Sequence, residues 1–117
     1  TATNTLKAIA ISHELKRPIL SNITGGLSGS ALKPVSLRCV WEIYDAVEIP
    51  VIGCGGISSW RDAVEYMLAG ASVLEIGTAI MTEGFTVFQK IEEGLHSFME
   101  NNGYQNIEDL VGVAHEA

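Results

Sequence analysis

The chain has 117 residues, of which 47% are hydrophobic and 18% charged, a composition that excludes disordered and low-complexity classes and suits one domain or part of one. Its formal net charge of −7 argues against nucleic acid or an anionic membrane as a partner, because both would repel it. No apolar run reaches the roughly 18 residues of a membrane span, no signal peptide is recognisable, and the two cysteines lack disulfide or zinc spacing, so we expect a cytoplasmic protein.

The first 33 residues predict a hairpin-like excursion followed by a loop. Residues 8–11 and 18–20 are brief apolar runs on either side of a polar turn at residues 13–16. Residues 24–29 read TGGLSG, which predicts a glycine-rich loop before the first helix.

From Pro34 onward the pattern alternates between helix and strand. Pro34 suits the first turn of a helix, and residues 50–53 form a short apolar run that ends in glycine, as in a strand covered on both faces. Ser59 followed by Asp62 predicts a capping box and a second helix, which Gly70 closes in the left-handed conformation.

The second half of the chain repeats this pattern. Residues 73–77 predict another strand ended by glycine, and residues 84–101 predict a long amphipathic helix. Asn106 and Asp109 predict the cap of one final short helix. Short connections in this order predict parallel strands, and because a small open sheet would leave apolar strand edges bare, we expect part of a larger α/β unit.

Three glycine-bearing stretches, at residues 25–29, 53–56 and 77–78, are the candidate binding motifs. Glycine lets a backbone approach a phosphate closely, unpaired N–H groups at a helix start favour an anion, and Thr78 adds a hydroxyl. In (β/α)₈ barrels the loops after the seventh and eighth strands commonly hold a phosphate. Tight turns without a ligand are the alternative, and neither a Walker A loop nor a Rossmann fingerprint is present.

The cysteines and histidines of the chain give little indication of a catalytic nucleophile or a metal site. Cys54 lies among glycines, but no lysine, arginine or histidine occurs in the six residues before it, so we expect a small packing residue and not a reactive thiol. We expect the same of Cys39. The scattered His13, His96 and His115 predict surface positions and no metal site.

Four motifs occur in order along the chain: NTLK at 4–7, TGGLSGSALKP at 24–34, IPVIGCGGI at 49–57 and LAGASVLEIGTA at 68–79. Together they resemble the C-terminal part of class 1 dihydroorotate dehydrogenases, with the strongest resemblance to the 1B catalytic subunit. The resemblance covers essentially the whole chain. Residues 84–114 are also similar to the flavin domain of dihydropyrimidine dehydrogenases.

The resemblance implies that residues 1–117 are the C-terminal portion of an FMN-binding TIM (β/α)₈ barrel, an α/β fold, comprising roughly strands six to eight and their helices. It implies FMN as the cofactor and the oxidation of dihydroorotate to orotate in pyrimidine biosynthesis. Asn4 and Thr5 would bind the substrate. The FMN contacts would fall on Gly29, Gly55, Gly56, Gly77 and Thr78.

The resemblance also bears on catalysis and partners. The family's cysteine base lies in an earlier loop, so we expect no catalytic residue in this chain and no activity from it alone. The implied partners are the rest of the barrel, a second copy in a homodimer, and an electron-transfer subunit with FAD and an iron–sulfur cluster. The alternatives are an FMN domain of the dihydropyrimidine dehydrogenase type and a non-catalytic half-barrel module.

Overall fold

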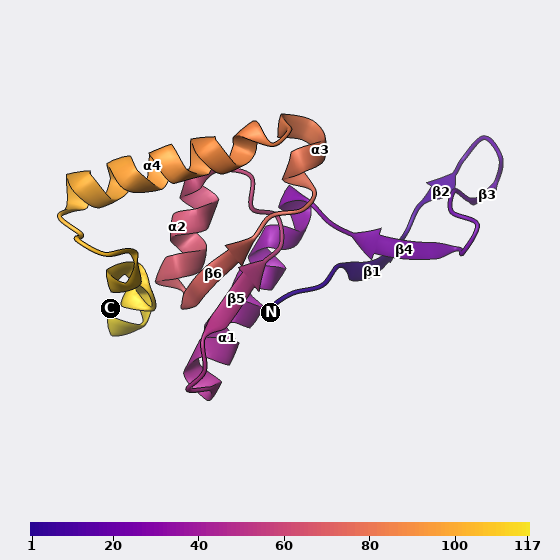
Figure 1. The fold of residues 1–117 in the computed structure, drawn as a ribbon. Helices are drawn as coiled ribbons and strands as arrows, with labels where there is room; N and C mark the ends of the chain where they lie inside the picture. The colour runs from indigo at the N-terminus through magenta and orange to yellow at the C-terminus, as the bar shows by residue number, and fades with distance from the viewer.

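The computed structural model describes residues 1–117, which form a body and a projecting arm (Figure 1). In the body, strands β5 (Val51–Cys54) and β6 (Ala71–Glu75) pair in parallel. The helices of the body are α1 (Lys33–Ala46), α2 (Trp60–Leu68), α3 (Ala79–Glu83) and α4 (Thr86–Asn102). Helix and strand alternate as the sequence predicts, so the prediction of an α/β chain with parallel strands is confirmed.

The first residues of the chain extend this sheet on the free side of β5. Ala2 forms a parallel bridge with Gly53, and the Ala2 N–H donates to the Ile52 carbonyl over 2.8 Å. The Cys54 N–H donates to the Ala2 carbonyl and the Thr3 N–H to the Cys54 carbonyl, each over 2.7 Å. The N-terminal segment, β5 and β6 therefore run in the same direction, and their carboxyl ends meet at one edge of the sheet.

Local signals in the sequence place the start of α2 where the structure has it. The Asp62 N–H donates to the Ser59 hydroxyl over 3.3 Å, and the Ser59 N–H donates to Asp62 Oδ2 over 3.0 Å. These reciprocal bonds are the predicted capping box, which satisfies two otherwise unpaired groups at the helix start. Gly70 follows the last turn with a positive φ of 116°.

Three element boundaries differ from the predictions. Strand β6 begins two residues earlier than predicted, because Ala71 already pairs with Val51, and it ends before Gly77. The predicted helix over residues 84–101 begins late and has a neighbour that the pattern missed. The short α3 precedes it, and Gly84, with φ of 69°, separates the two helices.

The C-terminal segment also differs from the prediction. Asn106 and Asp109 form the predicted capping box, but the single short helix is two 3₁₀ turns, η2 (Ile107–Leu110) and η3 (Val113–Glu116). Gly112, with φ of 78°, interrupts the helical path between them. A residue in the left-handed conformation ends a right-handed turn, which explains the division.

The arm consists of two short antiparallel ribbons that project from the body (Figure 1). Strand β1 (Leu6–Ile9) pairs with β4 (Thr24–Leu27), and β2 (Ile11–Ser12) pairs with β3 (Arg17–Pro18) around the predicted polar turn. The hairpin is thus confirmed, but the prediction that residues 24–27 are loop is wrong. Gly26 is a strand residue whose missing side chain leaves space for the side chain of Thr5, since a Cβ at residue 26 would lie 2.6 Å from the Cβ of Thr5.

The core lies within the body, between the sheet and the helices around it. The most deeply buried side chains include Val40, Tyr66, Val87 and Leu110, and no residue from 3 to 31 is buried. None of the helices combines the length and the apolar composition needed to cross a bilayer. The body therefore carries the packing that positions the strand ends.

His115 contradicts the expectation of a surface position. Its side chain is 12% exposed and stacks on Trp41 with 3.6 Å between ring centroids. Its Nδ1 lies 2.9 Å from Asp45 Oδ1 and its Nε2 lies 2.9 Å from the Ala69 carbonyl oxygen. These contacts hold the C-terminal turn against α1 and the end of α2.

Candidate functional site

A cavity of about 320 Å³ opens where the parallel segments end. Residues that follow the N-terminal segment, β5 and β6 line it, together with the loop that precedes α1. All the predicted site residues contribute to this lining: Asn4, Thr5, Gly29, Gly55, Gly56, Gly77 and Thr78. The structure therefore brings together four stretches that are far apart in the sequence.

Backbone N–H groups dominate the polar character of this cavity. The N–H groups of Gly55, Gly56, Gly77 and Thr78 donate no hydrogen bond within the chain. The lining contains no lysine or arginine, and Glu75 is its one charged residue. Unpaired N–H groups at strand ends and helix starts bind anions, so a phosphate here would depend on the backbone and not on side-chain cations.

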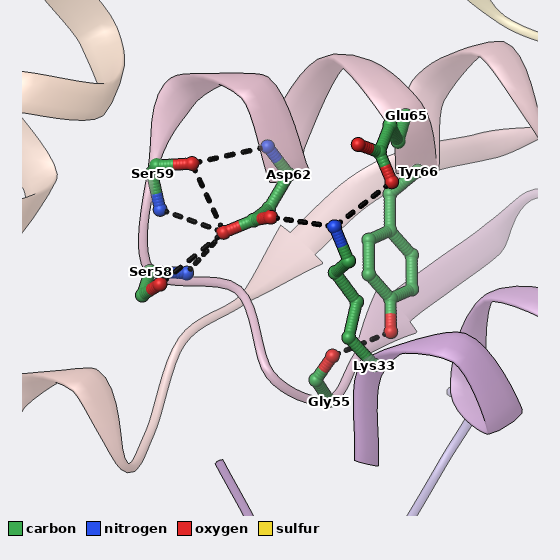
Figure 2. Close-up of polar contacts among 7 residues, drawn as sticks. All are labelled: Lys33, Gly55, Ser58, Ser59, Asp62, Glu65 and Tyr66. Atoms are coloured by element: carbon green, nitrogen blue, oxygen red, sulfur yellow. Dashed lines mark hydrogen bonds and ion pairs between the residues drawn. The ribbon is translucent and has the colours of Figure 1, made fainter. Parts of the chain in front are cut away.

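Tyr66 holds the turn after β5 from behind (Figure 2). Its hydroxyl donates to the Gly55 carbonyl over 2.6 Å, and its side chain is fully buried. Burial raises the pKa of Tyr66 above its ordinary value of 10.0, which keeps the hydroxyl protonated as a donor. Because C=O and the following N–H point in opposite directions in a trans peptide, this bond directs the Gly56 N–H away from Tyr66.

Gly56 and Gly77 are glycines for different reasons. Gly56 has φ of 70°, and a Cβ there would lie 2.7 Å from the Gly29 carbonyl oxygen and 2.8 Å from the Cβ of Lys33. The protein's own packing thus requires glycine at 56. Gly77 has no such φ, and no atom of the chain lies within 4 Å of the place its Cβ would occupy. No contact within this chain therefore requires glycine at 77, so a steric reason for it would have to come from a group outside the chain.

Asn4 and Thr5 lie at the exposed side of the cavity. The Thr5 N–H donates to Asn4 Oδ1 over 2.8 Å, which fixes the side chain of Asn4 against the backbone. The amide NH₂ of Asn4 makes no hydrogen bond within the chain, so it can donate to a ligand. Other polar residues on the lining that sequence reasoning missed are Thr3, Ser28, Ser30, Ser58, Glu75 and Thr82.

Cys54 occupies a different position from the one expected of a packing residue. It is half-buried and lies on the cavity lining. Burial raises the pKa of its thiol above 9.0, and the charge of Glu75 on the neighbouring strand raises it further. Since the thiolate is the nucleophilic form, this environment agrees with the expectation that Cys54 is not a reactive thiol.

An ion-pair cluster that sequence reasoning missed lies behind the same turn (Figure 2). Lys33 Nζ is 2.8 Å from Asp62 Oδ1 and 2.9 Å from Glu65 Oε2. The hydrogen bond with Asp62 is the main cause that raises the pKa of Lys33 above 10.5. Burial opposes ionisation of Asp62, but hydrogen bonds from Lys33, Ser58 and Ser59 outweigh it and lower its pKa below 3.8.

The fold and the cavity define a class: α/β proteins with a cavity lined by glycine turns at the carboxyl ends of parallel strands. Comparison with known proteins is more specific. The family model for dihydroorotate dehydrogenase matches residues 1–99. On this evidence the chain belongs to the dihydroorotate dehydrogenase family.

Individual relatives agree with this assignment. The catalytic subunit of dihydroorotate dehydrogenase B (NAD(+)) from Pyrococcus furiosus is 50% identical over 113 residues, which are 97% of this chain and 38% of that protein. The corresponding subunit from Phocaeicola vulgatus is 51% identical over 111 residues, which are 94% of this chain and 36% of that protein. These relatives confirm the resemblance to the B-type catalytic subunit, of which the chain spans little more than a third.

Solved structures support the same family. The crystal structure of the Eimeria tenella DHODH in complex with ferulenol matches with a TM-score of 0.81 and 32% identity, covering 99% of this chain and 31% of that one. The ligand-free structure from the same organism matches with a TM-score of 0.82 and 31% identity, covering 99% of this chain and 32% of that one.

Proposed function

We propose that residues 1–117 are the carboxyl-terminal portion of the FMN-binding TIM barrel domain of a B-type dihydroorotate dehydrogenase catalytic subunit. The N-terminal segment, β5 and β6 would be strands six to eight of that barrel. Their parallel order and the meeting of their carboxyl ends at one cavity support this proposal. The whole enzyme would oxidise dihydroorotate to orotate in pyrimidine biosynthesis.

The observation that carries the proposal is the open space at Gly77 beside unpaired backbone N–H groups. The N–H groups of Gly55, Gly56, Gly77 and Thr78 would hold the FMN phosphate, and Gly29 would contact the cofactor from the loop before α1. Glycine at 77 leaves the space that a phosphate needs, so these residues fit the group. When bound, FMN supplies the two-electron acceptor for the oxidation.

Asn4 and Thr5 would bind the pyrimidine ring of dihydroorotate. The free amide NH₂ of Asn4 supports this role, because it can donate to a ring carbonyl while Asn4 Oδ1 is held by the Thr5 N–H. The Thr5 hydroxyl adds a second donor and acceptor at the same side of the cavity. The two residues would orient the substrate without taking part in proton transfer.

The base that removes the substrate proton would lie in the remainder of the barrel. Cys54 is the cysteine on this cavity, and its raised pKa keeps the thiol protonated, so little thiolate is present to accept a proton. We therefore expect no turnover from these 117 residues alone. The further partners in this proposal are the rest of the barrel, a second copy of the subunit, and an electron-transfer subunit with FAD and an iron–sulfur cluster, located in the cytoplasm.

The test uses the complete catalytic subunit that contains these residues. We expect the purified protein to show a flavin absorption spectrum and to oxidise dihydroorotate in preference to dihydrouracil. Preference for dihydrouracil would favour a dihydropyrimidine dehydrogenase-type domain instead. A colourless protein that cannot be loaded with FMN would contradict the cofactor assignment and favour a non-catalytic half-barrel module.

A further inference from the structure

We propose that Lys33 is a positioning residue whose ammonium group, held by Asp62 and Glu65, clamps the loop before α1 onto the turn after β5. The clamp would set how two glycine stretches that line the cavity, at Gly29 and at Gly55–Gly56, pack against each other beside the phosphate. This inference rests on the proposed function of the cavity. It assigns a role to an ion pair that touches neither substrate nor cofactor.

The backbone of Lys33 already lies against the turn. A Cβ at residue 56 would lie 3.0 Å from the Lys33 backbone nitrogen, 2.8 Å from the Lys33 Cβ and 2.7 Å from the Gly29 carbonyl oxygen. The Gly29 carbonyl in turn accepts from the Leu32 N–H over 3.0 Å. The loop before α1 and the turn after β5 are therefore in direct contact, and a small displacement of either changes the shape of the cavity that both line.

The side chain of Lys33 reaches the other end of the same turn (Figure 2). Asp62 binds Lys33 Nζ through Oδ1, and its Oδ2 accepts the N–H groups of Ser58 and Ser59, each over 3.0 Å. One carboxylate thus ties Lys33 to the backbone that begins two residues after Gly56. Lys33 and Asp62 expose only 24% and 14% of their side chains, so solvent screens this pair less than an exposed one.

Lys33 is not part of the cavity lining, although it lies behind it. Two carboxylates surround its ammonium group, so its charge is neutralised locally and is not directed at an anion in the cavity. A phosphate would therefore sense Lys33 through the position of the glycine loops. Arg38 offers a matched control on the same helix, since its pair with Glu42 is well exposed, at 63% and 58%, and remote from the cavity lining.

The experiment titrates FMN and riboflavin into the apoprotein of the complete catalytic subunit and follows flavin fluorescence. Riboflavin lacks the phosphate, so the ratio of the two dissociation constants reports the phosphate end alone. We expect Lys33→Met to weaken FMN binding about tenfold, as for loss of one charge-assisted hydrogen bond, with riboflavin binding unchanged. Lys33→Arg should restore FMN binding, and Arg38→Met should match the wild type.

Each other outcome overturns the clamp. Equal weakening of both flavins by Lys33→Met would mean general destabilisation, and unchanged FMN binding would mean that the ion pair does not reach the phosphate loops. If the wild type binds FMN no better than riboflavin, the phosphate site fails, and the proposed function of the cavity fails with it. If the wild type prefers FMN over riboflavin and the Lys33→Met variant shows the same preference, the clamp is overturned and the phosphate site stands.

A milder variant keeps the test decisive if Lys33→Met does not fold. Glu65→Gln removes the charge of the more exposed partner and leaves the capping box of α2 intact. We expect it to weaken FMN binding to a smaller extent than Lys33→Met, with riboflavin binding unchanged. A loss shared by both flavins, or no loss for FMN, would overturn the inference.

Discussion

The body and the arm of this chain differ in how far their apolar side chains are buried. The body buries its apolar residues between a parallel sheet and its helices, and Tyr66 and Leu110 are fully inaccessible. The arm, residues 6–27, buries none, although it is rich in isoleucine and leucine. Its large exposed side chains are Leu6, Ile9, Ile11, Leu15, Ile19, Leu20, Ile23 and Leu27.

The difference distinguishes the body, which the chain stabilises with its own core, from the arm, whose apolar side chains remain available to another polypeptide. The body has a core of its own, and the strand-end turns rest on it through Tyr66 and the Lys33–Asp62 pair. The arm is held by short antiparallel ladders, and contiguous exposed apolar side chains of this kind mark surfaces that another polypeptide covers. The remainder of the barrel or a second subunit would supply that cover.

The largest expected effect compares one large apolar residue from each region. Leu110→Ala should lower the free energy of unfolding by about 2–5 kcal/mol, because it removes a fully buried side chain and leaves a cavity. Ile19→Ala, at a side chain that is 62% exposed in the arm, should change it by less than about 0.5 kcal/mol. Denaturant unfolding of the two variants of the 117-residue chain checks this. A loss for Ile19→Ala as large as that for Leu110→Ala would contradict the exposed position of the arm in this chain.

The next effect concerns binding and not stability. Gly77→Val should leave the folded state nearly as stable as the wild type, because no atom lies within 4 Å of the new Cβ. It should weaken FMN binding by about 100-fold, since the side chain enters the space of the phosphate and blocks charge-assisted hydrogen bonds. Flavin titration and thermal unfolding of the same sample separate the two quantities. Unchanged flavin affinity would contradict the phosphate assignment.

Tyr66→Phe should have an intermediate effect on both quantities. It removes the hydroxyl that donates to the Gly55 carbonyl over 2.6 Å and leaves that carbonyl without this donor. We expect a loss of about 1–2 kcal/mol in unfolding free energy, and weaker FMN binding because the Gly56 N–H is no longer held in one direction. Tyr104→Phe, which removes the hydroxyl of a tyrosine that stacks on Phe98 and is not on the cavity lining, is the control. Identical flavin affinity in Tyr66→Phe and wild type would contradict this role.

The smallest expected effect is the pH dependence of the Lys33–Asp62 pair. Because the folded state lowers the pKa of Asp62 below 3.8, its contribution is present above that pH and is lost as the pH falls through the lowered value. The raised pKa of Lys33 makes its contribution complete below pH 10.5 and lost only at higher pH. We expect the acid-side loss to be at most about 1 kcal/mol, since both groups are partly exposed.

Unfolding measured between about pH 2 and pH 5 tests this last prediction. Asp62→Asn should reduce the slope of unfolding free energy against pH in this range, because the variant has no carboxyl to protonate at that position. Equal slopes for the variant and the wild type would mean that Asp62 does not titrate with folding.

Much of the site was predictable from residues close together in the sequence. The Ser59–Asp62 box, the apolar run before Gly53 and the glycine after β6 are local patterns, and each marks a strand end or helix start. The resemblance added Asn4 and Thr5, which no composition or spacing singles out. The structure brings these residues to one cavity, whereas their roles toward FMN and dihydroorotate remain predictions.

Other features escaped prediction for physical reasons. Strand β4 contains Gly25 and Gly26, which favour loops locally, but pairing with β1 overrides that preference. The five-residue α3 is too short to show a periodic apolar stripe. His115 looks like a surface histidine in a polar tail, and only its packing against Trp41 and Asp45 gives it a partly buried position.

The amino-acid sequence by itself determined the order of helices and parallel strands, the capped start of α2 and the glycine turns, because these depend on residues within one helical turn or one strand. Tertiary structure alone decided that the turns share a cavity, that Tyr66 orients the Gly55 carbonyl, and that Lys33 meets Asp62 across 29 positions of the chain. Contacts at such separation depend on how the helices pack on the sheet. No local pattern carries that information.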